Sequence, residues 1–172
     1  MLVELYCLNT SSNPSRNTSA SPSQNLIADH DDFFENLQTE EEAEHDHTVA
    51  LLAGSRFAYP SDEHPDWTTH MNVPERTAGI NHGMGLVYPD IIVSNSRMEI
   101  VRVVQVVSKM TMNMDDVNLW KVCSSLSDAF FLFVRIETRA KVLQVLNFHR
   151  IPFRGLGLYA YDSHSRFLSK VD

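Results

Sequence analysis

The sequence predicts an α/β domain in which helices cover both faces of a mixed β-sheet. Two apolar stretches, 98–108 and 129–136, have the β-branched and aromatic content of strands that are buried on both sides. Two stretches with apolar residues at helical spacing, 113–126 and 138–150, alternate with them. Alternation of this kind after a strand pair is typical of a mixed sheet flanked by helices.

The composition suits one folded domain and argues against a membrane protein. The 172 residues are 43% hydrophobic and 21% charged, which is ordinary for a globular chain. No window of about 18 apolar residues is present, so we expect no transmembrane helix. The first residues also lack the basic segment of a secretion signal. We therefore expect a cytoplasmic protein that does not bind membranes.

The sequence offers little support for a structural metal or disulfide framework. Cys7 and Cys123 lie far apart, so neither a disulfide framework nor a cysteine-based zinc site is expected. His45 and His47 are two residues apart, whereas zinc ligands on a helix prefer a spacing of three or four. A zinc site is therefore not the favoured interpretation of the histidines.

Charge is distributed unevenly along the chain. The net charge is −8, whereas a protein that grips duplex DNA along its surface usually carries an excess of Lys and Arg. Acidic residues gather between Asp29 and Asp66, and most of the Lys and Arg lie between Arg97 and Lys170. The second half thus remains a candidate for nucleic-acid binding, and the acidic segment is an alternative surface for a protein partner.

The N-terminal part is predicted to be a tail followed by a helix. Residues 9–25 are mostly Ser, Asn, Thr and Pro, and they offer too little apolar surface to offset the entropy of ordering. We predict a disordered tail over residues 1–30 and a single domain over residues 31–172. A short helical turn is expected at 31–37.

The first long helix is predicted to begin at Thr39 and to end at Gly54. Thr39-Glu40-Glu41-Glu42 has the pattern of a capping box, and glycine commonly follows the last turn of a helix. The residues expected to face the core recur at helical spacing: Ala43, His47, Ala50 and Leu51.

The remaining elements follow a long loop. Residues 59–85 contain three Pro and three Gly without a clear period, so at most one short strand is expected there, near 67–73. Residues 86–93 and 98–108 are predicted strands joined by a turn at 94–97. With a last strand at 155–161, the predicted order is α-(β)-β-β-α-β-α-β.

This order, with the Tyr88-Pro89-Asp90 turn, resembles the PD-(D/E)xK (restriction-endonuclease-like) nuclease superfamily over about residues 40–162. In that family a helix is followed by a three-strand meander, a second helix and a further strand. A Pro-Asp pair opens the second core strand, and an acid-x-Lys triplet lies on the third. Here Pro89-Asp90 takes the first position, and Gln105-Val106-Val107 falls where the triplet is expected.

The downstream segment also resembles small prokaryotic members of this superfamily. A helix that contains Trp120 is followed by the strand Phe131-Leu132-Phe133-Val134 and by an Ala- and Leu-rich helix over 140–146. The weight of the resemblance comes from the ordered set of features, because a Pro-Asp pair alone has low specificity.

The resemblance implies a metal-dependent phosphodiesterase centre. Asp90 and Gln105 would hold Mg²⁺, which polarises the scissile phosphate and lowers the pKa of the attacking water. Val107 replaces the lysine that stabilises developing charge, and Lys109, on the same face of the strand, is the candidate substitute. Glu44 on the first helix would be an accessory acid. DNA or RNA would be the ligand, Mg²⁺ the cofactor if the protein is active, and a homodimer the assembly often found among relatives.

Each of these residues also has an ordinary structural interpretation. Asp90 can cap a strand end after a turn, and Gln105 can be a core amide bonded to Asp90 or to the backbone. Lys109 can be a solvated strand end, and Glu44 can belong to an acidic helix face. The resemblance therefore implies a divergent nuclease-fold protein with a degraded or weakly active centre. The alternatives are a non-enzymatic protein-interaction module with an acidic N-terminal segment and, less favoured, a small-ligand domain.

Overall fold

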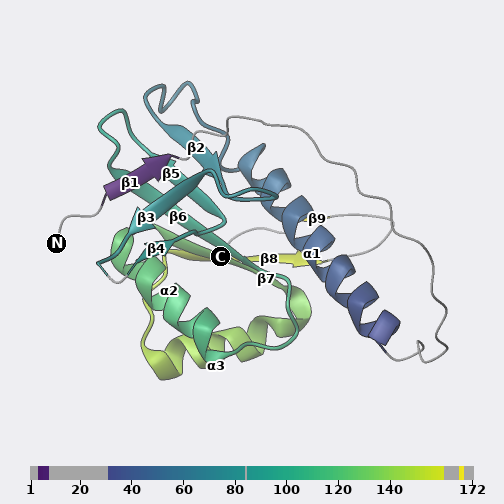
Figure 1. Ribbon diagram of the computed structural model, residues 1–172. Helices are drawn as coiled ribbons and strands as arrows, with labels where there is room; N and C mark the ends of the chain where they lie inside the picture. Colours follow the sequence, from purple (N-terminus) through teal and green to yellow (C-terminus); the bar gives the residue numbers. More distant parts are fainter. Residues whose placement is uncertain (1–3, 8–30, 84, 161–166, 169–172) are drawn as a thin grey trace, which may run out of the picture.

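The computed structural model describes residues 4–7, 31–83, 85–160 and 167–168 (Figure 1). Its elements, in chain order, are β1 (Glu4–Cys7), α1 (Asp31–Ala53), β2 (Thr68–Met71), β3 (Ala78–Asn81), β4 (Leu86–Val87), β5 (Ile91–Ser94), β6 (Ile100–Val107), α2 (Met114–Leu126), β7 (Phe130–Arg135), the 3₁₀ turn η1 (Ile136–Thr138), α3 (Arg139–His149), β8 (Gly155–Ala160) and β9 (Phe167–Leu168). The prediction of a mixed α/β architecture is confirmed.

A six-stranded mixed sheet in the order β2-β5-β6-β7-β8-β9 forms the centre of the fold. Strands β2, β5 and β6 make an antiparallel meander, β6, β7 and β8 run parallel, and β9 is antiparallel to β8. Parallel strands end on the same side of a sheet, so β6, β7 and β8 finish together at Val107, Arg135 and Ala160. We call this side the carboxyl end of the sheet.

Helices cover both faces of this sheet (Figure 1). On one face α1 contributes Val49 and Leu52 to a buried core that includes Val104 and Val106 of β6. On the other face α2 and α3 pack their buried side chains, among them Trp120 and Leu146, in the cluster that contains Val103 and Val107. None of the helices in the described ranges combines the length and apolar character needed to cross a membrane.

Gly157 shows how closely the parallel strands pack. It lies in β8 beside Phe133 of β7, and a Cβ atom at this position would overlap the phenyl ring. Glycine is therefore required here so that the ring can fill the core.

A small second sheet, in the order β1-β3-β4, corrects two predictions. Glu4–Cys7 lie in the predicted tail but pair antiparallel with β3, so the tail prediction is wrong for these four residues. Residues 8–30 lie outside the described part of the chain. β3 falls in the segment predicted as loop, whereas β2 matches the short strand expected near 67–73.

Helix α1 starts earlier than predicted. It begins at Asp31 instead of Thr39, so Thr39 lies inside the helix and is not its N-cap. The predicted end is confirmed, because α1 stops at Ala53 and the N–H of Gly54 donates to the carbonyl of Ala50 at 2.9 Å.

The predicted core-facing side of α1 is wrong. Ala43 and Ala50 are exposed and Leu51 is 38% exposed. The buried residues are Glu44, Thr48, Val49 and Leu52. This side packs Val49 and Leu52 in the core and also brings the carboxylate of Glu44 to Arg135 at the carboxyl end of the sheet.

Candidate functional site

Asp90 and Gln105 meet at the carboxyl end of the sheet. Asp90 immediately precedes β5, and the pairing of Ile91 with Val104 places it opposite Gln105 on β6. The strand predicted over 86–93 is divided at Tyr88-Pro89-Asp90, so Asp90 lies where the chain turns from β4 into β5. Both side chains are buried. The structure thus brings together two of the residues that the sequence identified.

One carboxylate oxygen of Asp90 faces three donors. Oδ2 of Asp90 lies 2.5 Å from Nε2 of Gln105, 2.6 Å from the backbone N of Val106 and 3.3 Å from Nε2 of His45. Hydrogen bonds to an ionised acceptor are stronger than those between neutral groups, so this arrangement stabilises the buried carboxylate. The Oε1 atom of Gln105 is buried and has no hydrogen-bond partner within the described residues.

Asn72, just after β2, fixes the turn that presents Asp90. Its N–H donates to the carbonyl of Asp90 at 2.9 Å, and its Nδ2 donates to the carbonyls of Pro89 and Ala78 at 2.7 and 2.8 Å. Its Oδ1 accepts from the N–H groups of Thr77 and Ala78, both at 2.8 Å. All four hydrogen-bonding positions of this buried amide are therefore used. Sequence analysis missed Asn72, whose one local signal was a polar residue close to Pro74.

His45 of α1 lies between two carboxylates. Its Nε2 faces Asp90, and its Nδ1 lies 3.1 Å from Oδ1 of Asp46. Carboxylates only accept hydrogen bonds, so both contacts together require a proton on each ring nitrogen. Burial by itself lowers the pKa of His45, but the hydrogen bonds and negative charges of Asp90 and Asp46 outweigh burial and raise it to about 9. His45 is therefore an imidazolium at neutral pH.

Glu44, the predicted accessory acid, pairs with an arginine. Its Oε2 lies 3.3 Å from Nη1 of Arg135, the last residue of β7, and only 4% of the glutamate is exposed. Arg135 also has its Nε 3.6 Å from Oε2 of Glu137. The Glu44–Arg135 pair joins α1 to the sheet, so the structure gives Glu44 a position at the carboxyl end but an arginine as its partner.

Lys109, the predicted substitute for the missing lysine, pairs with an acidic residue of α2. It follows β6, its side chain is 59% exposed, and its Nζ lies 3.7 Å from Oδ1 of Asp116 in the first turn of α2. A cavity of about 170 Å³ lies between these elements, with Gln105, Lys109, His45 and Asp116 in its lining. Gln105 and Lys109 therefore line the same cavity.

The donor set does not fit a magnesium ion. Mg²⁺ demands six oxygen ligands in octahedral geometry and commonly binds through one or two carboxylates together with water. Here Oδ2 of Asp90 faces three nitrogens, Gln105 presents its NH₂ group, and His45 adds positive charge. Across the described ranges, no three His, Cys, Asp or Glu side chains are grouped to hold a metal ion. Val107, at the lysine position, is buried in the core below α2.

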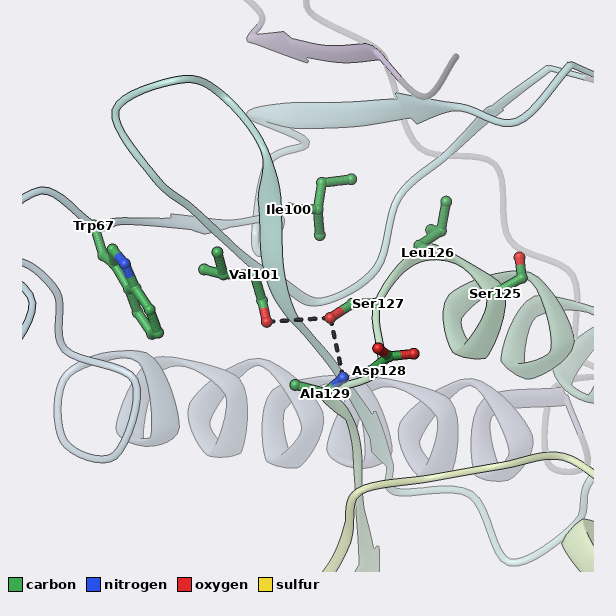
Figure 2. Close-up of a pocket in the computed structure, with 8 residues that line it drawn as sticks. All are labelled: Trp67, Ile100, Val101, Ser125, Leu126, Ser127, Asp128 and Ala129. Carbon is green, nitrogen blue, oxygen red and sulfur yellow. Dashed lines mark hydrogen bonds between the residues drawn. The ribbon is translucent and has the colours of Figure 1, made fainter. Parts of the chain in front are cut away.

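A larger pocket of about 540 Å³ lies at the opposite end of the sheet (Figure 2). Figure 2 shows Trp67 across the pocket from Ser127 and Asp128. The hydroxyl of Ser127 donates to the carbonyl of Val101 at 3.1 Å and accepts from the N–H of Ala129 at 3.0 Å, so it fixes the loop after α2. Asp128 is the one charged residue among those that line this pocket. The carboxyl end, with several converging charged groups, is the stronger candidate site.

Raising the pH from about 6.5 to about 9 is expected to lower the free energy of unfolding by on the order of 2 kcal/mol. The pKa of His45 is about 9 in the folded protein and 6.5 without its partners. The stabilisation that the charged His45 ring contributes is therefore complete below pH 6.5 and is lost as the pH rises through 9. The charged groups described near the ring are Asp90 before β5, Asp46 on α1, and Lys109 and Asp116 across the cavity. Urea unfolding measured at several pH values over this range checks the expectation.

The His45→Gln variant is the control, because its stability should vary little over the same range. Two other groups with shifted pKa values, Cys123 and His70, change the stability mainly outside this pH range. Burial raises the pKa of the Cys123 thiol, so that group adds a decline only above its ordinary value of 9.0, whereas burial lowers the pKa of His70 and its effect falls below pH 6.5. A wild-type stability that stays constant between pH 6.5 and 9 would contradict the charged state assigned to His45.

No protein-family model matches this chain, and no curated protein has significant sequence similarity to it.

Proposed function

We propose that this chain is a divergent PD-(D/E)xK-fold protein that binds nucleic acid without hydrolysing it. The order of elements supports this kinship: α1 is followed by the meander β2-β5-β6, then by α2 and β7, and the β3–β4 hairpin is an insertion in the meander. The observation that carries the proposal is the hydrogen bond between Asp90 and Gln105. This hydrogen bond joins the start of β5, the second strand of the meander, to the end of β6, the third strand. These are the two positions at which PD-(D/E)xK proteins carry their acidic residues.

Three features of the same centre support the loss of hydrolysis. Oδ2 of Asp90 is engaged by nitrogen donors, Gln105 has no charge, and Val107 cannot stabilise the negative charge that develops on a phosphate. The lysine nearest along the strand, Lys109, is paired with Asp116.

Basic side chains around the carboxyl end support binding to phosphates. Lys109, Arg139 and Lys141 are exposed, and they come from the segments that follow β6 and β7. Nζ of Lys141 lies 3.3 Å from the carbonyl of Met110, which brings these two segments together. Residues 97–160 contain nine Lys and Arg against five Asp and Glu, whereas residues 31–96 contain two against thirteen. Contacts to phosphates position a protein on nucleic acid without reading its sequence.

Fluorescence anisotropy with short labelled single-stranded DNA, duplex DNA and single-stranded RNA tests the proposal. We expect the full chain to bind at least one of them with a Kd of about 1–100 µM at low salt, and to bind more weakly as salt is raised. EDTA should leave the affinity unchanged, because no metal takes part. Lys109→Ala and Lys141→Ala should each weaken binding several-fold. Arg97→Ala is the matched control, because Arg97 is 80% exposed in the β5–β6 turn at the other end of the sheet.

Failure to bind any of these nucleic acids at low salt would refute the proposal and favour a second candidate. The exposed Glu40 and Glu42 of α1, with the excess of acid in residues 31–96, suit a surface that binds a basic protein partner. An equal loss of affinity in Arg97→Ala and in the two lysine variants would remove the carboxyl end as the binding surface.

A further inference from the structure

We propose that His45 occupies the position of a divalent cation at Asp90, so that the protein closes this centre to metal with one of its own side chains. The inference rests on the proposed function, because it treats the Asp90–Gln105 pair as the remnant of a metal centre. It goes beyond that function because it assigns the exclusion of metal to His45 of α1 and predicts that removal of this side chain lets a divalent cation bind at Asp90.

The contacts of His45 carry the first step. Its Nε2 lies 3.3 Å from Oδ2 of Asp90, and its Nδ1 lies 3.1 Å from Oδ1 of Asp46. A ring held between two carboxylates carries a positive charge at the place where a bound cation would neutralise Asp90. A divalent ion entering beside this ring would meet a like charge at close range, and such repulsion is strong in a partly buried site.

Gln105 provides an independent observation. It is 92% buried, since 8% of it is exposed, and its Oε1 has no hydrogen-bond partner within the described residues. Its NH₂ group is directed to Asp90 instead. Rotation of the amide by half a turn would direct Oε1 to Asp90, and two oxygens that face each other in this way are stable only with a cation between them. The buried amide oxygen is therefore a ligand that the present arrangement leaves unused.

The cavity beside these groups supplies room for a hydrated ion. His45 and Gln105 line it together with the ion-paired Lys109 and Asp116, and its volume is about 170 Å³. A water molecule takes about 30 Å³ of liquid volume, so the cavity accommodates an ion that keeps several waters, as Mg²⁺ and Mn²⁺ do. Removal of the imidazole would extend this space to Asp90 and would remove the positive charge that faces it.

A titration with Mn²⁺ alone, followed by NMR, tests the inference. Mn²⁺ broadens signals of nearby nuclei, so a bound ion would broaden the backbone amide of Val106 and the side-chain amide of Gln105. We expect His45→Ala to show this selective broadening at Mn²⁺ concentrations at least about tenfold lower than any that affect these signals in the wild type. His47→Ala, a histidine variant on the same helix, is the matched control and should behave as the wild type does.

Two results would overturn the inference. One is selective broadening at Val106 and Gln105 in the wild type at the same Mn²⁺ concentrations as in His45→Ala. The other is a folded His45→Ala variant whose signals respond no more than those of the wild type. If His45→Ala does not fold, His45→Asn, which is neutral and polar, takes its place in the same comparison. No nucleic acid is present in this experiment, so its outcome is independent of the binding test for the proposed function.

Discussion

Replacement of Asp90 by alanine is expected to lower the free energy of unfolding by about 3–5 kcal/mol. The substitution removes the acceptor shared by the Gln105 amide, the N–H of Val106 and the ring of His45. A buried donor left without a partner costs about 1–3 kcal/mol, and a buried charge costs more. Urea unfolding of the wild type and the variant at neutral pH measures the difference.

Two further variants test whether the loss of stability in Asp90→Ala comes from the three contacts of the Asp90 carboxylate. Asp128→Ala removes an exposed carboxylate at the opposite end of the sheet and should change stability by less than about 0.5 kcal/mol. Asp90→Asn keeps the shape and one acceptor oxygen, so its loss should be intermediate. A loss below about 1 kcal/mol in Asp90→Ala would mean that the three donors do not depend on this carboxylate.

Replacement of Arg135 by alanine is expected to cost about 2–4 kcal/mol of unfolding free energy. Arg135 faces the buried Glu44 at 3.3 Å, and the variant leaves this carboxylate inside the protein without its cation. The aliphatic part of the arginine is lost from the packing as well. Urea is the suitable denaturant, because a guanidinium salt screens ion pairs.

Comparison with an exposed arginine separates the buried pair from an ordinary surface contact. Arg97→Ala breaks a contact of 4.0 Å to Glu99 in which both side chains are exposed, and it should change stability by less than about 0.5 kcal/mol. The double variant Glu44→Leu/Arg135→Leu should be more stable than Arg135→Ala, because no uncompensated charge stays buried. Equal effects of Arg135→Ala and Arg97→Ala would show that the pair does not hold α1 on the sheet.

The central sheet and the two helices on one of its faces could be predicted because their signals are local. The Val-rich stretch of β6 and the Phe-rich stretch of β7 identify strands buried on both sides. Asn113 begins α2 as predicted, and its side chain accepts from the N–H groups of Asp115 and Asp116. Strand β3 escaped prediction because it spans four residues and its partner β1 lies in a distant part of the sequence.

Within the candidate site, the sequence predicted which residues of neighbouring strands lie together. It did not predict the contacts between helix α1 and the sheet. Asp90 and Gln105 could be placed together because the turn between β5 and β6 sets their register. His45 and Arg135 could not, because their roles depend on which side α1 presents to the sheet. Apolar periodicity indicated Ala43 and Ala50, whereas the side of α1 that faces the protein carries Val49, Leu52 and the ion-paired Glu44.

A cleavage assay tests most directly the proposal that this protein binds nucleic acid without hydrolysing it. The full chain is incubated with labelled single-stranded and duplex DNA and with RNA, in Mg²⁺, in Mn²⁺ and in EDTA. We expect every substrate to remain intact, while a complex with at least one of them forms equally well in EDTA. Metal-dependent cleavage by the wild type that disappears in a folded Asp90→Asn variant would contradict this expectation.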